Sequence, residues 1–358
     1  MPLNFLRAAF TLALALAAAL LCVQLRTPLP WMIGPLLATA ALSTLGAPTF
    51  SYTPLRNGGQ WVIGAALGLY FTPQVVALVA SLWWAIVLNV VWALALGVAF
   101  GAWLYRVHRA PGMLHIAGLS RTTSYFASPI GGASEMTLMA ERRGAQTELV
   151  ASAHSLRVLL VTLIIPFGFQ FAGLHGLDTT LLGARVVSWP GLAGLTVLTG
   201  AGCWVMVKLR RTNPWFLGSL AAAGLLTANG QTWSAIPTGL TNAAQLVIGI
   251  SLGVRFTRSF VHLAPRWLAS SALGTLAMIA LCASLAWGLA QATGLHWATV
   301  LLGTSPGGIA EMAITAKVLQ LGVPLVTAFH VTRLAAVLLL VEPMYRWIYE
   351  NNADSPYK

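Results

Sequence analysis

Long apolar stretches with almost no charged side chains recur from one end of the chain to the other. A helix that crosses a bilayer needs about 20 predominantly apolar residues. Only 8% of the 358 residues are charged, whereas about a quarter of the residues in a soluble domain carry a charge. The pattern therefore predicts an all-α polytopic membrane protein embedded in a lipid bilayer. The predicted spans are residues 8–25, 31–45, 61–80, 82–105, 149–171, 186–207, 215–228, 243–256, 267–290 and 325–348.

The net charge of +12 could indicate a nucleic-acid partner, because a basic face or arm is the electrostatic footprint of such proteins. The basic residues are instead scattered over the loops between apolar segments. This distribution fits the excess of Lys and Arg on the cytoplasmic side of membrane proteins. We therefore expect no nucleic-acid partner.

The chain also carries an internal duplication, which constrains the whole fold. SPIGGASEM begins at Ser128 and SPGGIAEM begins at Ser305. QWVIGAALGLYFT at Gln60 matches QLVIGISLGVRFT at Gln245, and PWMIGPL matches PWFLGSL. Five further pairs lie 176 positions apart: Gly131 and Gly307, Gly132 and Gly308, Glu135 and Glu311, His154 and His330, and Arg157 and Arg333. The duplication predicts a first membrane repeat at 1–177, a second at 178–349 and a short polar tail at 350–358.

The loop charges indicate how the two repeats are oriented. If each Gly-rich segment crosses the membrane, each half has six spans and the repeats are parallel. If each segment returns, each half has five spans and nearly all loop arginines fall on one side, as membrane proteins prefer. We therefore predict two inverted repeats of about five transmembrane helices, each with a Gly-rich re-entrant segment, and both termini in the cytoplasm.

The Gly-rich segments are the predicted site. Broken backbone at membrane depth is tolerated only where protein buries it or where it lines a watery cavity. Interrupted segments at corresponding places in two halves are a pointer to a transporter's binding site. The candidate substrate- or ion-binding residues are Ser128, Gly131, Gly132, Glu135, His154, Arg157, Ser305, Gly307, Gly308, Glu311, His330 and Arg333. Gln60 and Gln245 are candidates for lining the cavity.

The repeated charged residues allow several interpretations. Each Glu lies in the first turn of a short helix, where the helix dipole favours an anion, so it could cap that helix or bind a coupling ion, a proton or substrate. An Arg deep in an apolar helix costs roughly 2.5–3.5 kcal/mol without a partner. The arginines therefore either form the salt bridges Glu135–Arg157 and Glu311–Arg333 or bind an anionic group such as a carboxylate. The histidines, three residues before each Arg and on the same helical face, either relay protons or hydrogen-bond in the core.

Four glycines at small-xxx-small spacing predict close contacts between helices. They are Gly64, Gly68, Gly249 and Gly253, two in each repeat.

The repeated phrases, the PWMIGPL element and the two His-x-x-Arg segments resemble the AbrB-type integral membrane family over nearly the whole chain. This family is distinct from the small soluble DNA-binding regulator of the same name. The resemblance implies a multi-pass protein of the bacterial-type inner membrane. It also carries two labels, ammonia monooxygenase and regulator of gene expression.

The residues themselves support neither label. A monooxygenase needs copper or iron ligands, but the histidines show no HxxxH or ExxH arrangement and the cysteines are unpaired. The histidines are His108, His115, His154, His175, His262, His296 and His330, and the cysteines are Cys22, Cys203 and Cys282. We therefore expect no enzyme activity, no cofactor, no metal site, and buried, inert thiols.

The favoured function is a secondary transporter, coupled to an ion or to protons, for a small polar or anionic solute. The chain has no GxxxxGK[ST] motif for ATP-driven pumping. A membrane-embedded regulator that affects gene expression indirectly is the alternative, and an ammonia monooxygenase-like enzyme is the third. The sequence leaves the oligomeric state open, including a homo-oligomer.

Overall fold

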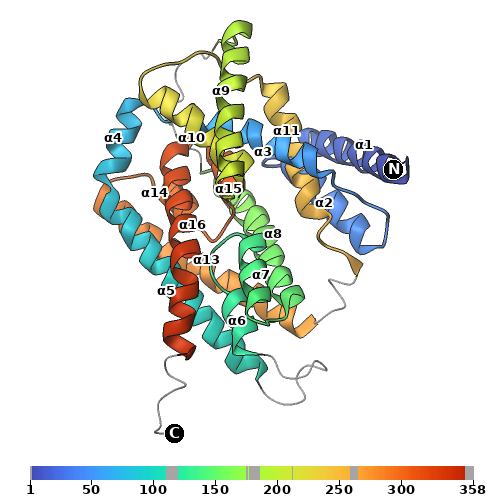
Figure 1. Ribbon diagram of the computed structural model, residues 1–358, viewed down its shortest axis with the longest axis vertical. Coiled ribbons are helices and arrows are strands. Elements are labelled where there is room, and N and C mark those ends of the chain that lie inside the picture. Colours follow the sequence, from blue (N-terminus) through green and yellow to red (C-terminus); the bar gives the residue numbers. More distant parts are fainter. Residues whose placement is uncertain are drawn as a thin grey trace.

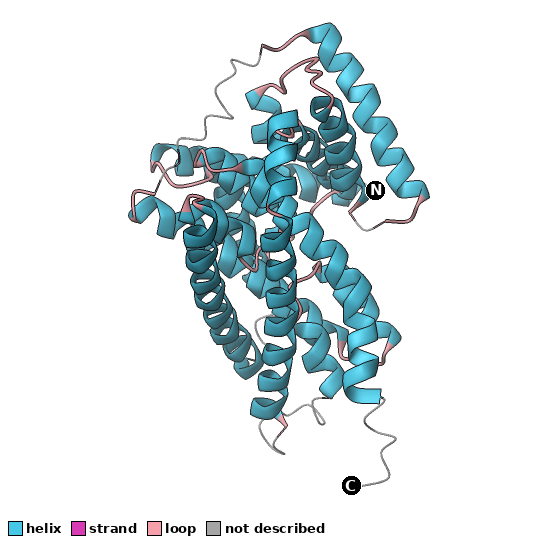
Figure 2. Cartoon of the chain, turned by 90° about the vertical axis from the view of Figure 1, so that its left-hand side faces the viewer, coloured by secondary structure: helices cyan, strands magenta, loops and turns pink. Residues whose placement is uncertain are grey.

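The computed structural model describes residues 2–109, 120–174, 176, 186–211, 213–258 and 265–350, and every regular element in these ranges is a helix (Figure 1 and Figure 2). The first half contains α1 (Pro2–Gln24), α2 (Pro30–Thr44), α3 (Thr53–Gly68), α4 (Pro73–Ser81), α5 (Trp83–His108), α6 (Arg121–Ala127), α7 (Ala133–Arg142) and α8 (Thr147–Phe171). The second contains α9 (Trp189–Lys208), α10 (Pro214–Ala228), α11 (Thr238–Gly253), α13 (Pro265–Thr293), α14 (Trp297–Thr304), α15 (Ile309–Val318), α16 (Val323–Tyr345) and a π-helical turn (Arg346–Glu350). The predicted boundary at 177/178, most of the predicted tail, and His115, His175 and His262 lie outside the described residues.

Among the described helices, six are long and apolar enough to cross a membrane: α1, α5, α8, α9, α13 and α16. The prediction of an all-helical membrane protein is confirmed at this level. Four further predicted spans correspond to α2, α3, α10 and α11, which have only 15 or 16 residues. The prediction of one continuous span at 61–80 is wrong, because α3 and α4 meet at an angle of 87°. Pro73, which lacks a backbone N–H donor, begins the new helix rather than continuing the old one.

Helices of one half pack on helices of the other half, and the most extensive of these contacts occur as equivalent pairs. Helix α2 packs on α11, and its counterpart α10 packs on α3. Helix α8 packs on α13, and its counterpart α16 packs on α5. Within the halves, α1 packs on α2 and α9 packs on α10 (Figure 1). This reciprocal exchange is the arrangement that a pseudo-twofold relation between the duplicated halves produces.

Glycines permit the closest of these contacts. A methyl group at Gly68 of α3 would lie 2.7 Å from the carbonyl oxygen of Leu220 on α10. A methyl group at Gly253 of α11 would lie 2.6 Å from the carbonyl oxygen of Leu36 on α2. Gly64 and Gly249 lie one turn earlier in the same two contacts. The predicted packing role of all four glycines is confirmed, since any side chain there would separate the helices.

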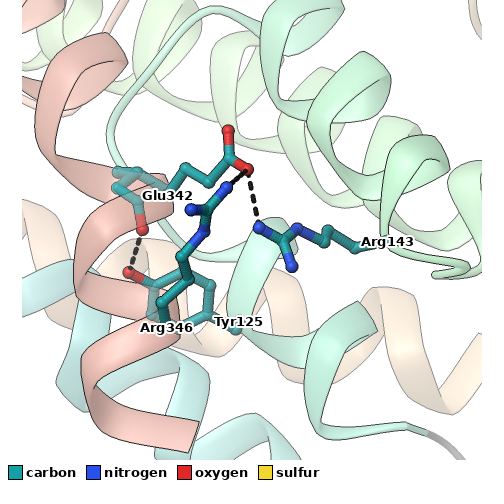
Figure 3. A network of polar contacts seen from close by, with 5 residues as sticks. Tyr125, Arg143, Glu342 and Arg346 are labelled. Atoms are coloured by element: carbon teal, nitrogen blue, oxygen red, sulfur yellow. Dashed lines mark hydrogen bonds and ion pairs between the residues drawn. The ribbon is translucent and has the colours of Figure 1, made fainter. Parts of the chain in front are cut away.

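The equivalent helices α8 and α16 run in opposite directions. At one end of the bundle, Arg143, just before α8, forms an ion pair with Glu342 near the end of α16, with 2.7 Å between Nη2 and Oε1 (Figure 3). At the other end, Gly176, which follows α8, donates its backbone N–H to the carbonyl oxygen of Leu319, which precedes α16, at 3.0 Å. Each helix therefore begins where the other ends.

The ion pair at the first end belongs to a larger polar network. Glu342 also accepts a hydrogen bond from Arg346 at 3.0 Å, and the hydroxyl of Tyr125 on α6 donates to the carbonyl oxygen of Val341 at 2.8 Å (Figure 3). The positions 176 residues away from this ion pair hold a leucine and a proline. Within the described residues, the network therefore ties the halves together at one end only.

Both Gly-rich segments form helical hairpins that return to the end from which they start. In the hairpin of α6 and α7, the hydroxyl of Thr123 accepts a hydrogen bond from the backbone N–H of Gln146, which follows α7, at 3.0 Å. In the hairpin of α14 and α15, the hydroxyl of Thr299 accepts one from the backbone N–H of Gly322, which follows α15, at 3.3 Å. These hydrogen bonds join equivalent residues and lie at opposite ends of the bundle. The two hairpins therefore approach one another from opposite ends.

Candidate functional site

The tips of the two hairpins each lie against a helix of the other half. A methyl group at Gly131 would lie 2.9 Å from Cγ1 of Val337 on α16. A methyl group at Gly307 would lie 3.0 Å from Cγ1 of Val161 on α8. Valines 161 and 337 are themselves equivalent positions. Only glycine lets the broken backbone approach the opposing helix this closely.

Arg157 and Arg333 bind the backbone where the helices break. Arg333, 3% exposed, donates to the carbonyl oxygens of Ser305 at 2.6 Å and Gly307 at 3.0 Å, just after α14 ends. Arg157 makes the two equivalent contacts after α6, at 3.1 and 3.5 Å. The last carbonyls of a helix have no partner in the helix and carry the negative end of its dipole. The guanidinium groups therefore stabilise broken ends that would otherwise be unsatisfied inside the protein.

The salt bridges considered from the sequence do not form. In the described part of the chain, neither Glu135 with Arg157 nor Glu311 with Arg333 makes an ion pair. Each carboxylate folds back over its own helix, so that a methyl group on the glycine three residues earlier would collide with it. The physical reason is that the two helices present opposite ends of their dipoles where the chain breaks. The arginine faces the carbonyl end of one helix, and the glutamate lies at the N–H end of the next.

The two histidines orient the arginines. His154 lies 2.7 Å from Nη2 of Arg157 through Nδ1 and 2.9 Å from the carbonyl oxygen of Phe126 through Nε2. A guanidinium has no acceptor, so Nδ1 must accept and Nε2 must carry the proton and donate. His330 makes the same pair of contacts, with Arg333 and with a carbonyl of α14. Both ring nitrogens are therefore occupied, and the geometry favours the core hydrogen-bonding interpretation over a proton relay.

The hairpin tips line a polar cavity of about 350 Å³. The candidate residues that line it are Gln60, Gly131, Gly132, Glu135, Arg157, Gly307, Gly308, Glu311, His330 and Arg333. Ser128, Ser305 and His154 are fully buried and do not line the cavity. Gln245 does not line it either. The structure therefore brings most of the sequence-derived candidates to one cavity, from both halves of the chain.

Equivalent residues differ in their access to this cavity. Gln60 lines the cavity and is half-buried, whereas Gln245 is only 6% exposed. Glu135 is half-buried, whereas Glu311 is only 8% exposed. The duplicated halves are thus alike in sequence and hydrogen bonding but not in exposure.

Sequence reasoning missed two arginines of the cavity wall, Arg56 at the start of α3 and Arg255 just after α11. Arg56 lies between the predicted spans 31–45 and 61–80, which makes it one of the loop arginines, and Arg255 lies inside the predicted apolar span 243–256. A signal for Arg255 was available, because its equivalent in the matched QWVIGAALGLYFT segment is Tyr70. An arginine inside an apolar span, where the other repeat has no arginine, indicates a role specific to its own repeat.

The described ranges contain no group of three His, Cys, Asp or Glu side chains that could hold a metal ion. Cys203 and Cys282 are buried, Cys22 is half-buried, and all three are free thiols. These residues do not contribute to the cavity wall.

These features define a multi-pass helical membrane protein whose duplicated halves bring two broken-helix hairpins to one polar cavity. The chain belongs to the AbrB family, because the family model described as "Transition state regulatory protein AbrB" matches residues 31–349. The resemblance seen in the repeated phrases is thereby confirmed.

Two relatives extend over almost the entire chain. A Bacillus subtilis (strain 168) protein named "Uncharacterized protein YhjN" is 25% identical over 383 aligned positions, which cover 99% of this chain and 96% of the relative. An Escherichia coli (strain K12) protein named "Putative regulator AbrB" is 27% identical over 341 positions, which cover 94% of each. Both alignments therefore include the two duplicated halves of the chain.

Proposed function

We propose that this protein is a secondary transporter of a small polar or anionic solute in the bacterial-type inner membrane. Its two halves are inverted repeats with the hairpins as re-entrant segments and both termini in the cytoplasm. The solute occupies the cavity at the hairpin tips, and a proton or another ion couples through Glu135 and Glu311. The protein carries out no catalytic step and contacts no nucleic acid.

The observation that carries the proposal is the meeting of two equivalent hairpins from opposite ends of the bundle at one polar cavity. The antiparallel directions of α8 and α16 support the inverted topology. Half-helices that end at the membrane midplane supply binding groups in many transporters of inverted topology. Broken backbone and polar side chains inside a membrane protein are typical of a water-filled cavity, and a protein with a purely structural role does not need such a cavity.

The unequal access of equivalent residues supports alternating access. Gln60 and Glu135 face an accessible wall, and Gln245 and Glu311 are more closed. In a pseudo-twofold transporter, exchanging the conformations of the two halves gives the state that opens to the other side. The present conformation is then one of the two end states of the cycle.

The test is electrophysiology on solid-supported membranes with purified protein in liposomes. Small carboxylates, amino acids, ammonium and alkali cations are applied, with and without a pH step. We expect a saturable current that is lost in Glu135→Gln/Glu311→Gln. Glu148→Gln, an exposed carboxylate at the start of α8, is the matched control and should retain it. No current and no solute-dependent change of the internal pH with any of these solutes, from protein that is monodisperse and folded, would contradict the proposal.

The name of the Escherichia coli relative favours a second candidate, a membrane-embedded regulator. A transporter that changes the concentration of a signalling solute alters gene expression without touching nucleic acid, so the two functions are compatible. A regulator that transports nothing would instead act through a partner protein and would give no current in the same liposomes.

A further inference from the structure

The cavity wall carries more positive than negative charge. Among the described residues, four arginines line it, Arg56, Arg157, Arg255 and Arg333, against two carboxylates. Arg157 and Arg333 are held by the carbonyls of the broken helices. The excess of charge therefore belongs to Arg56 and Arg255, the two arginines that the other repeat lacks.

Neither of these two arginines is satisfied within the described part of the chain. Nε of Arg56 is buried and has no hydrogen-bond partner. Arg255 is half-buried, and its side chain forms no ion pair or hydrogen bond with the described residues, although it lies close enough to Glu135 and Glu311 to interact with their charges. A guanidinium nitrogen that loses water without gaining a partner raises the free energy of the folded protein. Two guanidinium groups that lack a described protein partner beside one cavity indicate a mobile anion as their partner.

Buried, unpaired nitrogen atoms elsewhere in the same wall point to the same kind of ligand. Nε of Arg157 and Nε of Arg333 have no hydrogen-bond partner among the described residues, and both residues are at least 97% buried. The N-terminal ends of α7 and α15, which also line the cavity, add the positive ends of two helix dipoles. The wall thus presents donors to an anion from α3, α7, α8, α11, α15 and α16.

The shape and walls of the cavity limit the size of the anion. A volume of about 350 Å³ corresponds to roughly ten water molecules in the liquid, which is too large for a single halide. Part of the wall is apolar, from Ile130, Val158, Ile248, Leu252, Ile309 and Leu334. A planar carboxylate matches the fork of a guanidinium, and a short carbon chain matches the apolar wall.

Protonation of the two glutamates should be linked to binding of such an anion. The charged and titratable groups that face the cavity are Arg56 from α3, Glu135 from α7, Arg157 from α8, Arg255 after α11, Glu311 from α15, and His330 and Arg333 from α16. Ionised Glu135 and Glu311 compete with a bound anion for the positive charge of Arg255. Their negative charges also repel the anion. A proton taken from solution onto either carboxylate removes that competition, and the linkage is reciprocal.

We infer that the cavity binds a small organic carboxylate through Arg56 and Arg255, and that binding is accompanied by proton uptake on Glu135 and Glu311. The inference rests on the proposed transport function and specifies it as proton–carboxylate symport. Arg157 and Arg333 hold the broken helices in position, and Arg56 and Arg255 select the charge of the solute.

The test is isothermal titration calorimetry on the purified full-length protein in detergent. The probes are mono- and dicarboxylates of two to six carbons, the corresponding neutral amides, and chloride, phosphate and sulfate. Each titration is run in two buffers of different ionisation enthalpy, which reports the protons taken up. We expect carboxylates to bind, amides and inorganic anions not to bind, and protons to be taken up in the wild type.

Variants separate the roles of the residues. Arg255→Gln should weaken carboxylate binding about ten- to a hundredfold, as expected for a lost hydrogen bond between charged groups. Arg56→Gln is a second variant with the same expected direction. Arg142→Gln, an exposed arginine at the far end of α7, should bind as the wild type does. Glu135→Gln/Glu311→Gln should bind carboxylate without proton uptake.

Three results would overturn the inference. They are binding of amides as tight as carboxylates, binding of inorganic oxyanions in preference to carboxylates, and no binding of any probe. Carboxylate binding without proton uptake in the wild type would overturn the coupling. A liposome current carried by a cation or a neutral solute would leave the transporter proposal standing and refute only the carboxylate.

Discussion

Replacing Arg333 by methionine tests whether this arginine stabilises broken backbone or pairs with a carboxylate. Methionine keeps a long apolar side chain and removes the guanidinium. The variant leaves the carbonyl oxygens of Ser305 and Gly307, now bound at 2.6 and 3.0 Å, without their donor. It also leaves Nδ1 of His330 without its partner.

The expected loss follows from these contacts. A hydrogen bond to a charged group contributes about 1.5–3 kcal/mol, so two short ones amount to about 3–6 kcal/mol. Arg157→Met should cost less, because its equivalent contacts are longer, at 3.1 and 3.5 Å. Arg255→Met should cost little stability or even increase it, because its guanidinium makes no hydrogen bond or ion pair with the described residues.

The assay is thermal unfolding of the purified variants in detergent, followed by tryptophan fluorescence. We expect Arg333→Met to lower the melting temperature by about 5–10 °C, with Arg157→Met between it and Arg255→Met. Adding Glu311→Gln to Arg333→Met distinguishes the two kinds of partner. If the arginine paired with Glu311, removing the orphaned carboxylate would restore stability. Restoration by more than half, or equal melting temperatures for the three single variants, would refute the assignment of Arg333 to the backbone.

Two further predictions concern packing and access. Gly68→Ala should destabilise the protein by about 1–3 kcal/mol through overpacking, because the new methyl group would meet Leu220 of α10. The control is Gly58→Ala on the same helix, whose methyl group would meet no atom within 4 Å. It should be neutral in the same unfolding assay. In a background without the native cysteines, Gln60→Cys should react with a polar maleimide much faster than Gln245→Cys. During turnover in liposomes the labelling of Gln245→Cys should increase, and a constant low rate would count against alternating access.

Features that depend on local spacing could be predicted from the sequence. The duplication follows from matched polar residues at steady offsets, and the packing of Gly64, Gly68, Gly249 and Gly253 follows from their spacing. The convergence of Glu135 and Glu311 on one cavity was inferred from loop charges and the repeat. In each case the spacing of a few residues is enough to predict which segments are equivalent or which helices lie close together.

Features that depend on backbone groups could not be predicted in this way. A sequence displays the charges of Arg157 and Glu135 but not the unsatisfied carbonyls left where a helix stops. The two interpretations drawn from it, a salt bridge or an anionic ligand, therefore did not include the carbonyl oxygens that the arginines bind. The 87° bend between α3 and α4 was missed because both helices are apolar, and hydropathy does not report direction. The cavity role of Arg255 depends on the approach of α7 and α15, which are distant in sequence.

The reciprocal glycine contacts have a consequence for how the protein is made. Helices α2 and α3 are synthesised before α4 to α9, and their partners, α11 and α10, follow only afterwards. At a translation rate of about 5–20 residues per second, the interval is on the order of ten to forty seconds. During that interval the glycine-lined face of α3, and the face of α2 that later receives the glycines of α11, lie in the bilayer without the helices that fit them. Membrane insertion of the first half therefore precedes its folding, and lipid or an insertion factor must cover these faces until the second half arrives.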